Sequence, residues 1–89
     1  SPSNYSLNEI YPNPFNPSTE INFSNEFFAN ISIKVYDLQG KLVSILSDKY
    51  FQPGKHSIVW DAQNFSSGSY IIRMQSSNFE SSQLVTLIK

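Results

Sequence analysis

The sequence predicts an all-β domain, an immunoglobulin-like antiparallel β-sandwich of about seven strands. Short runs of alternating apolar and polar residues recur along the 89 residues, and turn-forming residues separate them. Aromatic residues make up 15% of the chain and supply large apolar side chains for a core. No window shows the apolar spacing of an amphipathic helix. These observations together favour two packed sheets.

The chain is long enough for one domain with a modest core, because a chain of this size buries about 60–70% of its unfolded surface. It begins without an initiating Met, so we expect a piece of a longer protein. We assign residues 1–4 to the end of a linker and residues 5–89 to the domain.

The first strand is expected at residues 5–10, and a stiff connector follows it. Proline fixes φ, lacks an N–H and pushes the preceding residue towards extended conformations, so this segment cannot form a helix or a paired strand. We predict a rigid crossover that sets the entry of the next strand, at residues 19–24, where Ile21 and Phe23 share one face. The connector consists of Pro12, Asn13, Pro14, Phe15, Asn16 and Pro17.

Residues 31–36 alternate most clearly, with Ile31, Ile33 and Val35 on one face. A type I turn follows, because Asp37 can accept from backbone N–H groups ahead of it and Gly40 tolerates positive φ. This turn joins a hairpin whose second strand covers residues 42–46.

A second turn is predicted at residues 51–54, before a strand in which His56, Ile58 and Trp60 share one face. A polar loop covers residues 61–67. Gly68 opens the next strand, where Tyr70, Ile72 and Met74 alternate with Ile71, Arg73 and Gln75. Residues 76–78 form a turn with Asn78 as the expected left-handed residue, and residues 83–89 form the last strand.

Charge and composition exclude several function classes. The formal net charge is −1 and the six basic residues are scattered, so we expect no nucleic-acid binding. Without Cys there is no disulfide framework or thiolate metal site. No apolar run is long enough to span a membrane and no signal peptide is present, so we expect no membrane insertion.

We expect no catalytic residue, no cofactor and no metal site. The single His56 is interpreted as a hydrogen-bonded, partly buried strand residue, and Asp37, Asp48 and Asp61 as turn residues. Six aromatic residues lie in or beside loops and are expected to cap the open ends of the core. They are Phe27, Phe28, Tyr50, Phe51, Phe65 and Phe79.

Several separated blocks together resemble the type A C-terminal sorting domain of type IX secretion systems. The first is the Pro-rich run from Tyr11 to Thr19 with Ile21 two residues on, and the second is the strand and turn of residues 33–41. The others are Gly54-Lys55-His56 with Ile58 and Trp60-Asp61, then Gly68-Ser69-Tyr70 with its strand, then the terminal Leu84-Val85-Thr86-Leu87-Ile88-Lys89. Two departures lie in loops: a short segment between Asp61 and Gly68, and Ser76-Ser77-Asn78 where a glycine is usual.

The resemblance implies that the domain is a sorting signal and not a catalyst. It implies a domain that directs an N-terminal cargo domain of the same chain from the periplasm across the outer membrane, to the cell surface or the medium. The implied partners are the type IX machinery and a sortase-like peptidase, which removes the domain and attaches the cargo to lipopolysaccharide. Two alternatives stay open: an immunoglobulin-like spacer similar to that of flagellar hook-capping proteins, and a carbohydrate-binding module.

We predict that the machinery recognises the last strand. An edge strand offers unpaired N–H and C=O groups to which a partner can add a strand. The predicted recognition residues are Leu84, Val85, Thr86, Leu87, Ile88 and Lys89, with Gly68 and Tyr70 in support. The alternative is that residues 84–88 are simply a buried strand. Asp37, Gly40, Trp60 and the connector residues are assigned structural roles.

Overall fold

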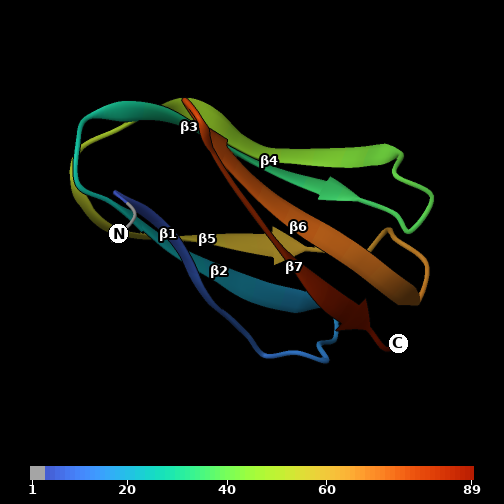
Figure 1. The fold of residues 1–89 in the computed structure, drawn as a ribbon. Helices are drawn as coiled ribbons and strands as arrows, with labels where there is room; N and C mark the ends of the chain where they lie inside the picture. The colour runs from blue at the N-terminus through green and yellow to red at the C-terminus, as the bar shows by residue number, and fades with distance from the viewer. Residues whose placement is uncertain (1–3) are drawn as a thin grey trace.

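The computed structural model describes residues 4–89 and contains seven strands in two antiparallel sheets (Figure 1). The smaller sheet has the order β1-β2-β5 and the larger sheet the order β4-β3-β6-β7. The predicted all-β sandwich is therefore confirmed. The bounds are β1 Tyr5–Tyr11, β2 Ser18–Asn25, β3 Ala29–Tyr36, β4 Leu42–Phe51, β5 Gly54–Asp61, β6 Gly68–Ser76 and β7 Phe79–Leu87.

The core lies between the two sheets and is formed by alternate residues of their strands. Ile21 and Phe23 of β2 face Ile31, Ile33 and Val35 of β3, and all five are fully buried. The alternation predicted these faces because successive side chains of a strand point to opposite sides of the sheet. The same alternation places Tyr70, Ile72 and Met74 of β6 in the core. Within residues 4–89 no helix could cross a membrane.

The prediction that the Pro-rich connector is a rigid crossover is wrong, because the connector joins two neighbouring strands of one sheet. β1 and β2 are antiparallel neighbours in one sheet, with Tyr11 opposite Glu20, so the connector is a wide hairpin loop. Its bonds Tyr11-Pro12, Asn13-Pro14 and Asn16-Pro17 are cis. The loop leaves its own sheet and reaches the end of β7 in the other sheet, near the C-terminus (Figure 1).

The turn after β3 has the predicted chemistry. Asp37 Oδ1 accepts from the backbone N–H of Gln39 and of Lys41, both at 2.9 Å. The Gly40 N–H donates to the Asp37 carbonyl at 3.0 Å, and Gly40 has φ +87°, which glycine adopts without a steric penalty.

We expect Asp37→Ala to lower the free energy of unfolding by about 1–2 kcal/mol, because one carboxylate oxygen satisfies two turn N–H groups. Asp37→Asn keeps an acceptor oxygen at the same place and should lose less. Urea denaturation of both variants checks this, and equal losses would contradict the assigned role of the acceptor.

Two details of the strand ends differ from the sequence prediction. The left-handed residue of the β6–β7 turn is Ser77, with φ 50°, and not Asn78. Ser76 pairs with Phe79, so the turn has two residues, and a positive φ at the first of them is the pattern of a type II′ hairpin. β4 and β7 are also longer than expected, because β4 pairs with β3 as far as Phe51 and β7 pairs with β6 from Phe79.

The loop aromatic residues divide into two groups. Phe51, Phe65 and Phe79 pack against the core as predicted. The prediction is wrong for Phe27, Phe28 and Tyr50, whose exposed fractions are 56%, 58% and 62%. Strand parity explains part of this, because Asn30 pairs with Tyr50 on the outer face, whereas Ala29 pairs with Phe51.

Only the last residue of the predicted linker, Asn4, lies within the described part of the chain. Of the predicted linker, Ser1, Pro2 and Ser3 lie outside the described residues, while the Asn4 carbonyl accepts from the Glu26 N–H at 2.9 Å. The start of β1 and the end of β7 lie at opposite ends of the sandwich (Figure 1).

Candidate functional site

β7 is an edge strand of its sheet, as the recognition hypothesis requires, but its outer side is occupied near the C-terminus. Phe15 forms a parallel bridge with Leu87: its N–H donates to the Thr86 carbonyl, and its carbonyl accepts from the Ile88 N–H, both at 2.9 Å. The side chain of Asn13 extends this contact. Its Nδ2 donates to the Leu84 carbonyl and its Oδ1 accepts from the Thr86 N–H, both at 3.0 Å.

The expectation of unpaired backbone groups is therefore wrong from the Leu84 carbonyl to the Ile88 N–H. Four groups that could have received an added strand are already bonded to the proline loop. Burial of Phe15, which is 3% exposed, holds the loop in this position. Contact through the C-terminal segment must then use side chains, unless the loop first leaves the edge.

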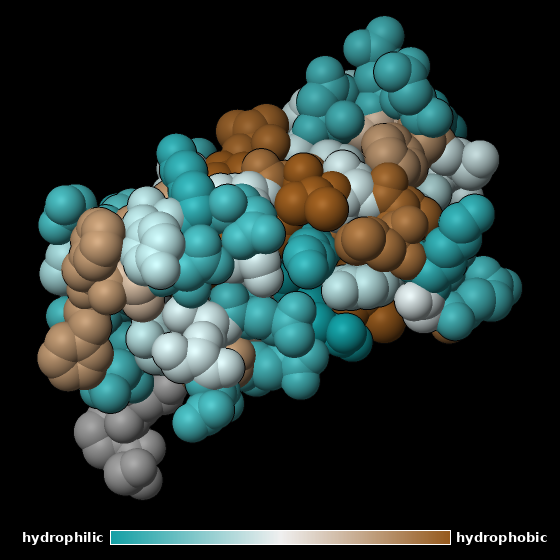
Figure 2. All heavy atoms as spheres, turned by 90° about the horizontal axis from the view of Figure 1, so that it is seen from above, coloured by the Kyte–Doolittle hydropathy of each residue, from teal (hydrophilic) through white to brown (hydrophobic). Residues whose placement is uncertain are grey.

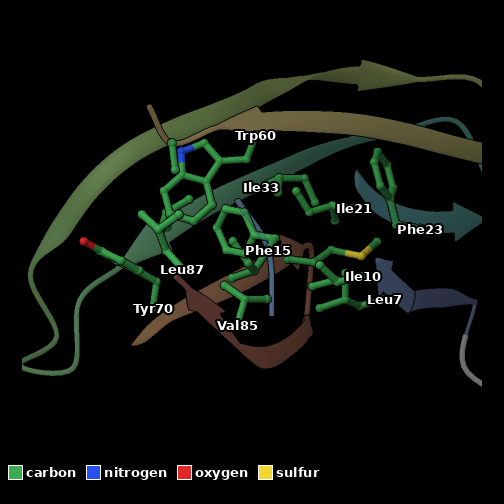
Figure 3. Close-up of a cluster of buried hydrophobic side chains, with 14 of the residues drawn as sticks. Leu7, Ile10, Phe15, Ile21, Phe23, Ile33, Trp60, Tyr70, Val85 and Leu87 are labelled. Carbon is green, nitrogen blue, oxygen red and sulfur yellow. The ribbon is translucent and has the colours of Figure 1, made fainter. Parts of the chain in front are cut away.

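Phe15 occupies the centre of a cluster that joins the loop to both sheets (Figure 3). Its ring centroid lies 5.4 Å from that of Trp60. The Trp60 ring also packs edge-on against Phe65 and Tyr70, each at 5.3 Å. Two further bonds fix the ends of the loop: Thr19 Oγ1 donates to the Pro12 carbonyl at 2.6 Å, and the Ala62 N–H donates to the Pro17 carbonyl at 2.8 Å.

The outer face of the larger sheet carries an apolar row that the sequence analysis missed. Tyr36 of β3 pairs with Leu42 of β4 and with Ile71 of β6, and Ile71 pairs with Leu84 of β7. The row therefore crosses all four strands. Leu84 and Leu42 are 55% and 42% exposed. Figure 2, seen from above, shows strongly apolar side chains gathered over part of this face, with polar side chains around them.

Charged side chains of β3, β6 and β7 border this apolar row. Arg73 lies over the Tyr36 ring, with its guanidinium carbon 4.6 Å from the ring centroid, and pairs with Glu80 at 3.1 Å. Lys34 is the cross-strand partner of Arg73 and of Ile45, which is 55% exposed. Exposed apolar groups rimmed by charges are typical of protein interaction surfaces.

Comparison with known proteins identifies the family. The family of secretion system C-terminal sorting domains matches residues 9–88. The chain belongs to this family. It is a type IX sorting domain, which directs export, and the sorting domain itself is not catalytic.

The fold agrees with this assignment. The sorting domain is similar to the crystal structure of dimeric latent PorU from Porphyromonas gingivalis, with a TM-score of 0.73 and 18% sequence identity. The likeness covers 94% of this chain and 9% of that chain, so the sorting domain spans about a tenth of that protein. Likeness at this identity shows the fold. No curated protein matches the sequence.

The predicted recognition residues of the sorting domain occupy two environments. Val85, Leu87 and Tyr70 are buried in the core, and Tyr70 donates its hydroxyl proton to the Ser66 carbonyl at 2.6 Å. The remaining members reach the surface. They are Leu84, Thr86, Ile88, Lys89 and Gly68, with Thr86 half-buried. Ile88 also lines a shallow hollow of about 340 Å³ with Pro12 and Pro14.

His56 of the sorting domain has a structural environment. Its Nε2 lies 2.8 Å from the Gln52 carbonyl and 3.1 Å from Asn25 Oδ1. Both neighbours are acceptors, so Nε2 carries the proton and donates to them. Across residues 4–89 no three His, Cys, Asp or Glu side chains gather as a metal site would require.

Proposed function

We propose that the sorting machinery recognises this domain as a folded surface, through the apolar row and the exposed side chains at its C-terminal end. The observation that carries the proposal is the continuity between them: Leu84 belongs both to the apolar row and to the segment from Leu84 to Lys89. Because Val85 and Leu87 anchor this segment in the core, it presents Leu84, Thr86 and Ile88 in fixed positions.

Gly68 and Tyr70 support the segment from the neighbouring strand. Gly68 pairs with Leu87 and Tyr70 pairs with Val85. Tyr70 in turn packs against Trp60, which lies against Phe15 of the proline loop. The proposed contact therefore depends on the folded core behind it, and an unfolded chain would not present the same side chains together.

We also propose the finer steps of export for this domain. Its cargo lies N-terminal in the same chain, passes through the periplasm, and reaches the surface or the medium, where a sortase-like peptidase removes the domain. The family resemblance supports these steps. An exported reporter that is smaller by the 10.1 kDa of this chain would indicate removal.

Export of a reporter tests the recognition surface. The reporter carries an N-terminal signal peptide and residues 1–89 at its C-terminus, in a bacterium with a type IX system. We expect Leu84→Lys to reduce export about tenfold or more, the loss that follows from removing an interface anchor. Deleting residues 84–89 is a poorer test, because Val85 and Leu87 belong to the core.

Val59→Lys is the matched control. Val59 is an aliphatic side chain, 62% exposed, on edge strand β5 of the opposite sheet. The Val59→Lys reporter should be exported normally. Circular dichroism of both variants, purified from the periplasm, should show that each is folded. Equal export of the two variants would overturn the proposed surface while leaving the family assignment intact.

A further inference from the structure

Within residues 4–89 a shallow hollow of about 530 Å³ falls in the size range of small-molecule sites, about 300–1,000 Å³. It lies beside the start of β3, the end of β4 and the β6–β7 turn. This end of the sandwich is remote from the proline loop and the C-terminus (Figure 1). A ligand bound there would leave the Leu84 to Lys89 segment free.

Two aromatic rings form one wall of the hollow. Phe28 and Tyr50 stack with their centroids 5.1 Å apart and their planes 19° apart. Each ring nevertheless exposes more than half of its surface. Large apolar rings held in a fixed orientation at the surface, instead of packed on the core like Phe51, are typical of ligand contacts.

Uncharged polar groups form the rest of the hollow. Asn30 and Ser32 lie two residues apart on the outer face of β3, and Ser32 pairs with Gln75 of β6. Among the described residues, no hydrogen bond uses the side-chain polar atoms of Asn30, Ser32 or Gln75. Ser32 as a whole is only 8% exposed, so its position at the hollow is fixed by its packing.

We propose that this hollow binds a neutral carbohydrate. Amides and hydroxyls supply both donors and acceptors, which matches the hydroxyl groups of a sugar, while the flat ring faces match its apolar C–H faces. Among the residues that the structure describes, no charged side chain lines the hollow, which disfavours a nucleotide or another anionic ligand. This site is separate from the sorting surface and does not depend on it.

The test is a titration of the 15N-labelled 89-residue chain with neutral tetrasaccharides of glucose, of xylose and of mannose, followed by NMR. We expect at least one of them to shift the signals of Ser32 and Ser77 and the side-chain amides of Asn30 and Gln75. Binding on the order of 0.1–1 mM is expected for a shallow site with two rings.

Tyr50→Ala should weaken this binding about tenfold, because it removes one of the two stacking rings. Phe27→Ala is the matched control, since Phe27 is 56% exposed in the neighbouring loop but does not line the hollow. The absence of shifts with all three sugars at millimolar concentration would overturn the proposal. So would equal affinities of the wild type and Tyr50→Ala.

Discussion

Replacing Phe15 by alanine is expected to lower the free energy of unfolding by about 3–5 kcal/mol. The ring is 3% exposed and packs against Trp60 in the centre of the core, so its removal leaves a cavity between the sheets. A second loss follows from the first. Phe15 holds the loop whose backbone pairs with Thr86 and Ile88, and that pairing weakens without the anchor.

Chemical denaturation measures this effect, with Phe27→Ala as the control for the same substitution at an exposed site. Asn13→Ala separates the two contributions. It removes only the side-chain bonds to Leu84 and Thr86 and should cost about 1 kcal/mol. A loss for Phe15→Ala no greater than for Phe27→Ala would show that the loop does not depend on its anchor.

The proline loop also bears on how the domain avoids unwanted pairing. An uncovered edge strand is a template for association with other chains. Here the last residues of β7 are covered by a segment whose prolines lack N–H groups and cannot continue a ladder themselves. The edge that the sequence led us to propose as a pairing site is instead sealed by residues of the same domain.

The sequence predicted correctly those elements whose structure is determined by neighbouring residues of the chain. β2, β3 and β6 follow the alternation because each has one face in the core, and the Asp37 turn follows from its own side-chain chemistry. The first half of β7 carries no such signal. Ser81 and Ser82 are in a strand because they pair with Met74 and Arg73, and nothing in their own chemistry requires it.

The candidate surfaces depend on contacts that the sequence does not reveal. Asn13 meets Leu84 across 71 residues of chain, and no local rule places an asparagine side chain on a distant strand. The apolar row had a partial signal, since Tyr36 and Ile71 stand at outward positions of their strands. Only the register of β3 with β4 and β6 shows that they form one row with Leu42.

Removing the hydrogen bonds of Asn25 is expected to cause the second large loss in the free energy of unfolding. Asn25 is 4% exposed at the end of β2 and satisfies three groups from three other segments. Its Nδ2 donates to the carbonyls of Phe27 and Phe51 at 2.8 and 3.2 Å, and its Oδ1 accepts from His56 Nε2 at 3.1 Å. Without it the carbonyls of Phe27 and Phe51 lose a part-buried donor and His56 keeps only the Gln52 carbonyl, and leaving a buried group without its partner costs about 1–3 kcal/mol.

Asn25→Ala should therefore lower the free energy of unfolding by about 2–4 kcal/mol in chemical denaturation. Asn22→Ala is the control on the same strand, since Asn22 makes one exposed bond to the Glu9 carbonyl and should cost less than about 1 kcal/mol. Asn25→Leu restores volume without polar atoms, so it should remain as unstable as Asn25→Ala. Recovery of stability in Asn25→Leu would mean that packing, and not hydrogen bonding, is what Asn25 contributes where the two sheets meet.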